Sequence, residues 1–231
     1  MKPILKRISQ EICEFEWEAA ISDVLLQHQL SFKAKLQEDF STEISELRMG
    51  FKTLAILLSK RVETSEIEAW LKAISSELSL KALPARIWQI PVCYSDETGR
   101  DLETLAKHKN IRPEELITIH SQTLYRLHFF GFLPGFMYLN GLPEALYASR
   151  KSIPDRSVPV GSIAIGGSQT GIYPSSSPGG WHLIGQTPLA LFDPSQDNPV
   201  FASPGERIEF LPISKLEFDR LTRHPHKPKF R

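Results

Sequence analysis

Three polar side chains in the second half of the chain could take part in acid–base chemistry. His120 and His128 precede a Gly-Phe-Leu-Pro-Gly-Phe run, and Asp193 precedes Pro194. Imidazole exchanges protons near neutral pH, and a carboxylate can act as a base. Both types are also common in structural roles, a histidine in a core and an aspartate in an Asx turn. We therefore predict His120, His128 and Asp193 as catalytic candidates, with these structural roles as the alternative.

Glycine, proline and aromatic residues crowd the same segment, 129–194. Glycine costs backbone entropy, so this density indicates turns with positive φ or a close approach of the backbone to another group. The segment predicts a pocket lined by backbone amides and aromatic faces, with simple turns in a barrel as the alternative. Its predicted substrate-binding residues are Phe132, Pro134, Gly135, Phe136, Tyr138, Tyr173 and Trp181.

Neutral and cationic side chains in this region could orient a ligand. Gln169 and Thr170 stand between glycines, where their side chains can hydrogen-bond to a ligand. Arginine and lysine bind carboxylates and phosphates, although on a surface they often form ordinary ion pairs. The basic residues that leave both possibilities open are Arg126, Arg150, Lys151 and Arg156, of which we include Arg156 in the predicted site.

Standard catalytic and metal-binding motifs are missing from the sequence. Gly166 and Gly171 have the spacing of a phosphate-binding P-loop, but Ile172 stands where lysine is required. The run from Gly166 to Thr170 lacks the last glycine of a nucleophile elbow. Neither HExxH nor CxxC occurs, so we expect no metal site.

The composition is that of an ordinary globular protein, with 41% hydrophobic and 23% charged residues. Lys+Arg and Asp+Glu both number 27, so no net charge attracts nucleic acid or an anionic membrane. No apolar stretch approaches the roughly 18 residues of a membrane span, and the first residues lack the apolar core of a signal peptide. Cys13 and Cys93 are far apart and lack metal-like spacing. We therefore expect a cytoplasmic protein with reduced thiols.

Hydrophobic periodicity divides the chain into two domains of an α+β protein. Over residues 1–90 it predicts the order β-α-β-β-α-β, which is typical of a ferredoxin-like domain with two helices on one face of a four-stranded sheet. The expected elements are strands within 4–17, 43–49, 53–58 and 86–92, and helices at 19–37 and from 63. Over residues 91–231, two short helices precede many short β-rich segments separated by Gly and Pro, which predicts a closed or nearly closed β-barrel.

An ordered series of motifs over residues 43–213 resembles the KipI/PxpB family, also called allophanate hydrolase subunit 1 or carboxyltransferase domain, subdomain C/D. The motifs are Ile90-Pro-Val-Cys-Tyr94, Gly131-Phe-Leu-Pro-Gly-Phe-Met-Tyr138, Val158-Pro-Val-Gly-Ser162, Gln169-Thr-Gly-Ile-Tyr-Pro174, Ser177-Pro-Gly-Gly-Trp181 and Leu191-Phe-Asp-Pro194. The resemblance implies a ferredoxin-like domain followed by a cyclophilin-like β-barrel. It departs at Asp155 and Gln186, where the family commonly has arginine.

The resemblance also implies a function, that of the B subunit of an ATP-dependent 5-oxoprolinase that opens the lactam of 5-oxo-L-proline to L-glutamate. Such a chain works with a paralogous C subunit and a separate A subunit, and it uses ATP with Mg shared with its partner. Two alternatives come from other relatives, an inhibitor of histidine-kinase autophosphorylation and a carboxyltransferase component of a urea-carboxylase-like system. The isolated chain is expected to be inactive.

Overall fold

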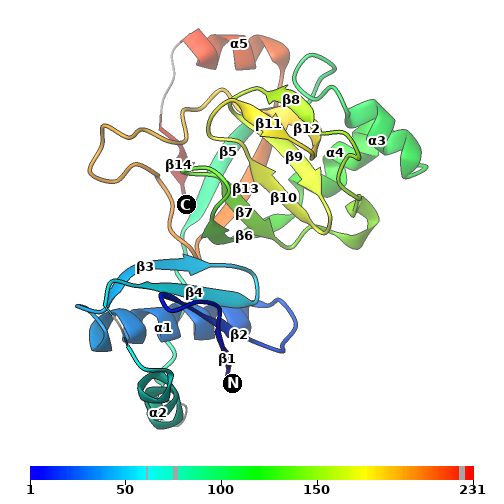
Figure 1. Ribbon diagram of the computed structural model, residues 1–231. Helices are drawn as coiled ribbons and strands as arrows, with labels where there is room; N and C mark the ends of the chain where they lie inside the picture. Colours follow the sequence, from blue (N-terminus) through cyan, green and yellow to red (C-terminus); the bar gives the residue numbers. More distant parts are fainter. Residues whose placement is uncertain (61, 75–77, 224–226) are drawn as a thin grey trace. The chain divides into compact units, whose positions relative to one another are not determined.

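The computed structural model describes residues 1–60, 62–74, 78–223 and 227–231, which form two compact units, Met1–Pro84 and Ala85–Arg231 (Figure 1). The division falls before the expected boundary at residue 90. The reason is that strand β5 (Ile87–Cys93) pairs with strands of the second unit, over its whole length with β13 (Arg207–Ile213).

The first unit contains an antiparallel four-stranded sheet with the order β1-β2-β4-β3. Its strands are β1 (Ile4–Arg7), β2 (Ile12–Glu16), β3 (Ile44–Met49) and β4 (Thr53–Leu58). The predicted β-α-β-β-α-β order is wrong, because the first β segment folds back on itself and residues 86–92 belong elsewhere. The fold-back is a turn in which Ser9 Oγ accepts hydrogen bonds from the backbone N–H groups of Glu11 and Ile12.

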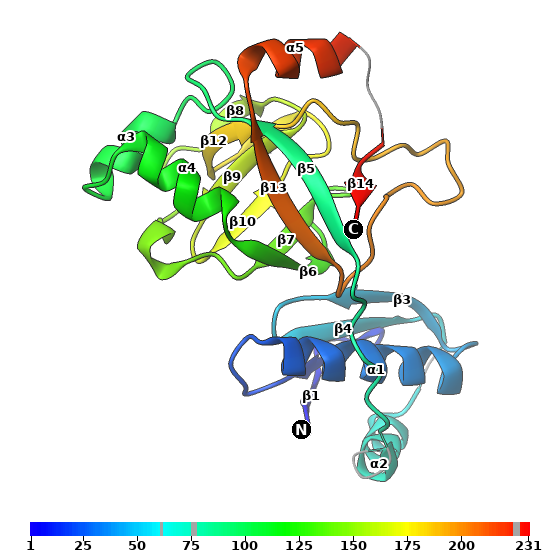
Figure 2. The ribbon, with the colours of Figure 1, turned by 180° about the vertical axis from the view of Figure 1, so that it is seen from behind.

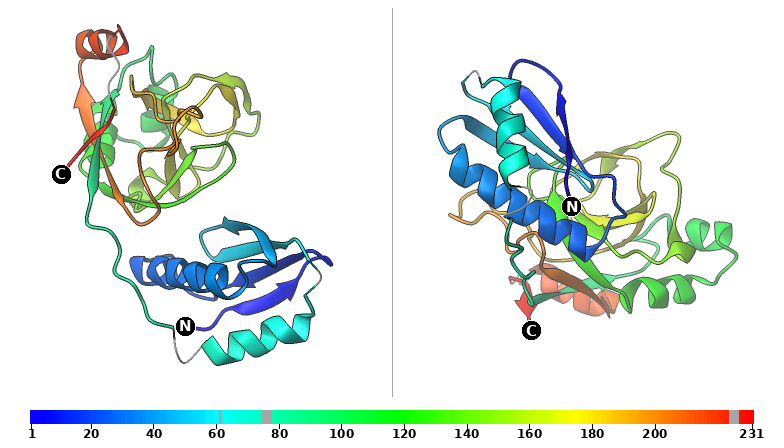
Figure 3. Two further views of the ribbon diagram at one scale, coloured as in Figure 1. Left: turned by 90° about the vertical axis from the view of Figure 1, so that its left-hand side faces the viewer. Right: turned by 90° about the horizontal axis from the view of Figure 1, so that it is seen from below.

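Two helices cover one face of this sheet, as the periodicity predicts (Figure 3). Helix α1 (Asp23–Asp39) begins at Ser22, whose Oγ accepts a hydrogen bond from the backbone N–H of Leu25 at 3.2 Å. Helix α2 (Thr64–Ile74) follows β4. Apolar side chains of both helices and alternate residues of β2 and β4 form a single core, so the first unit has a hydrophobic interior of its own.

Seven strands of the second unit close into a barrel within the described residues. Their order is β12-β9-β10-β7-β6-β13-β5, and β12 pairs again with β5 to complete the ring. The strands not yet given are β6 (Leu124–Phe130), β7 (Met137–Asn140), β9 (Ser162–Gly166), β10 (Gln169–Ile172) and β12 (His182–Gln186). The predicted closed barrel is therefore confirmed. Its neighbouring strands are antiparallel except β5 and β13, which run parallel side by side (Figure 2).

Shorter elements surround the barrel. They are α3 (Leu102–His108), α4 (Pro113–Ser121), the 3₁₀ turn η1 (Glu144–Leu146), β8 (Asp155–Val158), β11 (Ser177–Gly179), α5 (Lys215–Arg223) and β14 (Lys229–Phe230). Strand β14 pairs with β5, and β8 pairs with β11 in a separate two-stranded sheet. Buried apolar residues of α3 and α4 join those of the strands in one core, so the barrel is filled by side chains.

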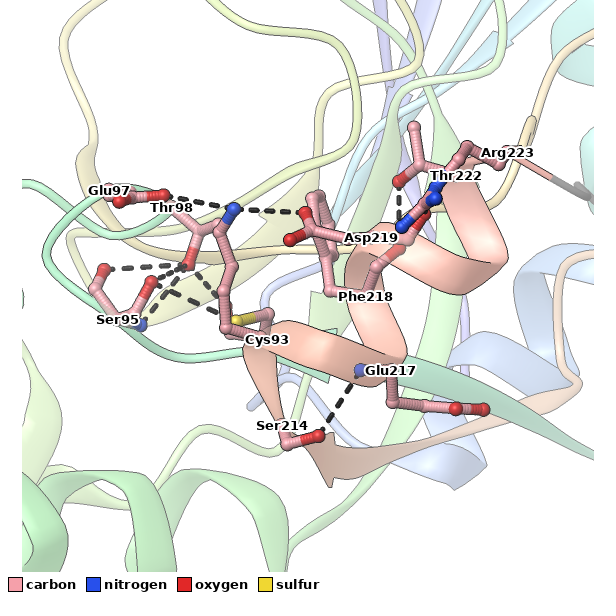
Figure 4. Close-up of polar contacts among 11 residues, drawn as sticks. Cys93, Ser95, Glu97, Thr98, Ser214, Glu217, Phe218, Asp219, Thr222 and Arg223 are labelled. Carbon is pink, nitrogen blue, oxygen red and sulfur yellow. Dashed lines mark hydrogen bonds and ion pairs between the residues drawn. The ribbon is translucent and has the colours of Figure 1, made fainter.

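A hydrogen-bonded turn follows β5 and carries the chain toward α3 (Figure 4). Thr98 Oγ1 donates to the carbonyl oxygen of Cys93 at 2.7 Å and accepts from the backbone N–H of Ser95 at 3.1 Å. Lys215 at the start of α5 pairs with Glu97 of this turn at 2.9 Å. The turn thereby fixes the exit of β5 and anchors α5 beside it. Among the described helices, none is long and apolar enough to cross a membrane.

Candidate functional site

Five aromatic residues that the sequence predicts as ligand-binding come together beside the barrel. Phe136, Tyr173 and Trp181 are buried in an apolar cluster separate from the main core, and Tyr138 packs against it. With the exposed Phe132 they line a pocket of about 330 Å³. Their rings meet mainly edge to face, for example Phe136 with Tyr173 at 5.0 Å between centroids. Such contacts hold the walls of the pocket in fixed orientations.

Glycines allow these rings to lie directly against the strands. A Cβ at Gly166 would stand 2.6 Å from the ring of Trp181, and one at Gly179 would stand 2.4 Å from the phenol oxygen of Tyr173. Both distances are far inside van der Waals contact. Close approach of backbone to side chain therefore explains part of the glycine density that marks this segment of the sequence.

The loop between β6 and β7 places Phe132 at the mouth of the pocket. Phe132 has a φ of +67° and a side chain that is 61% exposed, an unusual pair of properties for a bulky apolar residue. Gly135 also has positive φ and lies against Phe192, while Pro134 is exposed. Gly135 and Pro134 therefore shape the loop rather than line the pocket. Left-handed backbone at a non-glycine residue is characteristic of ligand-binding loops.

The two phenols of the pocket stay protonated at neutral pH. Burial raises the pKa of Tyr173 to about 12, and the nearby charge of Arg150 opposes this rise only in part. Burial also raises the pKa of Tyr138, again against the effect of Arg150. Both hydroxyl groups can therefore donate hydrogen bonds to an oxygen atom of a ligand, but neither is suited to act as a base.

Two cationic residues complete the pocket wall. The Arg150 guanidinium carbon lies 5.8 Å from the ring centroid of Trp181, and within the described ranges Arg150 has no carboxylate partner. The ammonium group of Lys151, in contrast, lies 2.6 Å from Asp101 and 2.7 Å from Asp155. Arg150 is therefore the cation that remains available for a ligand, while Lys151 fastens the segment that carries it.

The structure does not bring Arg156, the arginine included in the predicted site, to this wall. Arg156 is exposed on β8 and does not line the pocket, although Arg150 was recognised as a possible anion-binding residue. The two departures from the family pattern have structural partners. Asp155 also pairs with Arg100 at 2.7 Å, and the Gln186 amide donates to the carbonyl oxygen of Val160 at 2.7 Å.

His120 and Thr170 lie inside the barrel unit rather than at the pocket. Thr170 Oγ1 donates to the carbonyl oxygen of Ala164 at 3.0 Å and lies 3.0 Å from His120 Nε2. Nε2 must then carry the proton, and Nδ1 accepts from the hydroxyl of Tyr94 at 2.9 Å. Burial lowers the pKa of His120 to about 3, so the ring is neutral at physiological pH. These contacts connect α4 with β10 and with the residue that follows β5.

The other predicted polar residues also stand apart from the aromatic pocket. His128 is buried on β6, edge-on to Phe129, and Gln169 is half-buried at the start of β10. Asp193 is exposed and accepts two hydrogen bonds from Ser195, which lower the pKa of its carboxyl group. That is the Asx-turn geometry. The catalytic roles of His120, His128 and Asp193 remain predictions without support from their positions.

The described part of the chain has no cluster of side chains suited to a metal ion, and the aromatic pocket offers other groups to a ligand. No cluster of three or more His, Cys, Asp or Glu side chains there could hold a metal ion. The pocket therefore offers aromatic faces, two protonated phenols and one available guanidinium group. Such a site can bind and orient a small anionic ring and stabilise negative charge on it.

Comparison with known proteins identifies the family. The family model described as "Carboxyltransferase domain, subdomain C and D" matches residues 3–202. The chain belongs to this family. Two curated members carry the name of the B subunit of 5-oxoprolinase. That of Haemophilus influenzae is 39% identical over 204 residues, which cover 88% of this chain and 93% of the relative. That of Bacillus subtilis is 48% identical over 133 residues, 58% of this chain and 55% of the relative.

A solved structure supports the family fold at greater distance. The urea carboxylase of Kluyveromyces lactis matches with a TM-score of 0.79 over 98% of this chain and 23% of that chain. Its sequence identity is 15%, so this likeness concerns the fold alone. The chain is thus a mixed α/β member of the carboxyltransferase-domain family with a closed seven-stranded barrel.

Proposed function

We propose that this chain is the B subunit of an ATP-dependent 5-oxoprolinase, which opens 5-oxo-L-proline to L-glutamate. The observation that carries the proposal is the aromatic pocket with Arg150 at its wall. Flat apolar faces suit the lactam ring, and a guanidinium group without a carboxylate partner suits its carboxylate. The name that two curated family members share supports the same substrate.

The pocket groups match the charge that develops when such a lactam reacts. Amide resonance makes the lactam carbon a poor electrophile. Transfer of the γ-phosphoryl group of ATP to the lactam oxygen releases ADP and converts that oxygen into part of a leaving group. A first water molecule then adds to the carbon, and the ring C–N bond breaks as the nitrogen takes a proton, which leaves an acyl phosphate. A second water molecule hydrolyses the acyl phosphate to the new carboxylate and inorganic phosphate. The phenols of Tyr138 and Tyr173 can donate hydrogen bonds to the negatively charged oxygens of the phosphoryl group that is transferred to the lactam.

The same geometry explains why other chains of the enzyme are needed. Among the described residues that line the pocket there is no Asp, Glu or His, and burial raises the pKa values of both phenols. A general base must then come from elsewhere. We assign it to the paralogous C subunit or to the A subunit, and we expect the isolated chain to be inactive. ATP with Mg²⁺ would be shared with the partner, the ion being carried by the phosphate oxygens. Two free, buried cysteines fit a cytoplasmic location.

Co-expression with candidate A and C subunits tests the function directly. The complex is expected to release ADP and glutamate only when 5-oxoproline is present. The variant Arg150→Gln should raise KM for 5-oxoproline about tenfold or more, because a charge-assisted hydrogen bond is lost. The matched variant Arg112→Gln removes an exposed arginine outside the pocket and should leave KM unchanged. A complex without lactam-dependent ADP release would show that the function is wrong.

A further inference from the structure

A second hollow of about 640 Å³ adjoins the aromatic pocket, and Arg150 and Lys151 line both. Its other wall is formed by the end of α3, where His108 and Lys109 are located, and by His182 of β12. Helix α3 packs beside β12, so the hollow lies between two elements of the same unit. The lining combines basic and small polar side chains with Leu105, Tyr147 and Ile153, and it is more basic than the aromatic walls next to it.

The charged side chains that line this hollow are all cationic. Lys109, Arg150 and Lys151 line it together with two histidines, and no aspartate or glutamate does so among the described residues. Asp101 and Asp155 neutralise Lys151. Within the same described residues neither Lys109 nor Arg150 has a carboxylate partner. Two uncompensated cations facing one space attract an anion, although the protein as a whole has no net charge.

Backbone hydrogen bonds hold the segment that carries Arg150. Ala148 and Gly167 exchange two hydrogen bonds of 3.0 and 2.6 Å. On the other side of Arg150, the N–H of Lys151 donates to the carbonyl oxygen of Gly180 at 2.7 Å. These contacts fix the backbone from which the exposed Arg150 side chain reaches both hollows. A fixed backbone lowers the entropy lost when the segment binds a ligand.

The side chain of His182 connects Ser149, the residue before Arg150, to β12. His182 Nε2 lies 2.9 Å from the carbonyl oxygen of Ser149, so Nε2 carries the proton and donates. At the opposite wall, Lys109 donates from its ammonium group to the carbonyl oxygen of Tyr147, and its backbone N–H donates to Leu105 and Ala106 at the end of α3. The carbonyl end of the helix is therefore satisfied internally and leaves the ammonium group facing the hollow.

We propose that this basic hollow binds the phosphate groups of a nucleoside triphosphate, with Lys109 and Arg150 as the residues that contact them. Because Arg150 also borders the aromatic pocket, the terminal phosphate would lie beside the ring held there. The assignment of that ring to a lactam rests on the proposed function; the affinity of the hollow for phosphate groups does not. A P-loop is unnecessary here, since side-chain cations and a fixed segment supply the anion contacts.

Direct binding of inorganic tripolyphosphate to the purified full-length chain tests the site. Calorimetric titration should show saturable binding that weakens with added salt. Lys109→Gln and Arg150→Gln should each raise Kd about tenfold, the loss of one charge-assisted contact. Lys107→Gln removes an exposed lysine from the same helix, outside the hollow, and should leave Kd unchanged. Failure of the wild-type chain to bind tripolyphosphate, or equal binding by Lys109→Gln, would overturn the proposal.

Assays of the reconstituted complex test the phosphate site separately from the proposed 5-oxoprolinase function. Lys109→Gln should raise KM for ATP about tenfold and leave KM for 5-oxoproline unchanged. The reason is that Lys109 lines the basic hollow but not the aromatic pocket. Inorganic phosphate, ADP and ATP should compete with tripolyphosphate, and their affinities should increase with the number of phosphate groups. If tripolyphosphate binding depends on Lys109 but the complex releases no additional ADP when 5-oxoproline is added, the phosphate site is supported and the proposed function is wrong. An unchanged KM for ATP in an active complex overturns the site alone.

Discussion

The indole ring of Trp181 lies against the backbone of Gly166, where a Cβ atom would stand only 2.6 Å from three ring carbons. Gly166 ends barrel strand β9, and Trp181 forms a wall of the aromatic pocket. The barrel and the pocket therefore share this contact. The ring can take its place only because the strand carries no side chain at this position.

Replacing Gly166 by alanine should displace the indole ring and destabilise the barrel. Overpacking of a buried contact costs about 1–3 kcal/mol, which corresponds to a drop in melting temperature of roughly 3–9 °C for a unit of this size. Differential scanning calorimetry measures the shift. The matched variant Gly180→Ala adds a methyl group with no atom nearer than 3.7 Å and should leave the transition within about 1 °C. Equal shifts for both variants would contradict the steric explanation.

Phe132 should contribute to ligand binding at the expense of stability. Its φ of +67° favours glycine, and its exposed side chain buries little surface. We expect Phe132→Gly to leave the free energy of unfolding unchanged or to raise it by up to about 1 kcal/mol. The same variant should raise KM for the small-molecule substrate at least threefold. Urea unfolding and steady-state kinetics measure the two effects. A loss of stability above about 1 kcal/mol would assign Phe132 a structural role.

His120 should make the stability of the protein depend on pH. Its pKa is about 3 in the folded chain against 6.5 for an ordinary histidine, so the unfolded chain binds the proton more readily between these values. The free energy of unfolding must then fall as the pH falls below about 6.5. Its contribution is about 2 kcal/mol lost between pH 7.5 and pH 5. Urea unfolding at a series of pH values measures it.

The variant His120→Gln isolates this contribution, since His28 on α1, with a pKa lowered by burial to about 4, acts in the same direction. Glutamine can still donate to Thr170 but does not titrate. We expect a shallower pH dependence from it, together with lower stability at pH 7.5 because the contact with Tyr94 is lost. An unaltered slope in His120→Gln would refute the role given to burial.

Lys151 should contribute more to the free energy of unfolding than an exposed lysine that also has two acidic partners. Its side chain is 16% exposed, and its removal leaves Asp101 and Asp155 without this cation. Lys151→Met should cost about 1–3 kcal/mol of unfolding free energy and weaken ligand binding through Arg150. Lys215→Met also breaks two ion pairs, but at a side chain that is 42% exposed, and should cost less than about 0.5 kcal/mol. Similar costs in urea unfolding would contradict this difference.

Sequence patterns predicted the aromatic pocket because its chemistry is local. The rings of Phe136, Tyr138 and Trp181 lie in a segment dense in glycine, and some of these glycines lie directly against the rings. Both features are visible in the order of residues. Arg150 could not be chosen over Arg156 in the same way. Which cation reaches the pocket depends on the ion pairs of Lys151 and on backbone contacts with Gly167 and Gly180, and no local pattern records those partners.

In the first unit, too, local sequence patterns could not show which strands pair with each other. A run such as Ile87–Cys93 has the strand pattern whichever sheet it joins, and its partner Arg207–Ile213 lies far along the chain. Assigning it to the nearest elements was therefore wrong, whereas the helices and the barrel class, which depend on local periodicity and turn spacing, were predicted correctly. The turn at Ser9 differs, because it is formed by local hydrogen bonds from Glu11 and Ile12 to the Ser9 side chain.

The parallel pairing of β5 with β13 has a consequence for how the protein is made. A chain leaving the ribosome has every strand of the first unit once Leu58 has emerged, so that unit can fold early. Strand β5 emerges soon afterwards but waits for Ile213 before β13, the strand that pairs with it along its whole length, is complete. In the meantime its apolar residues stay exposed, and closing so long a loop is slow. Chaperone dependence during synthesis should therefore concentrate on the barrel.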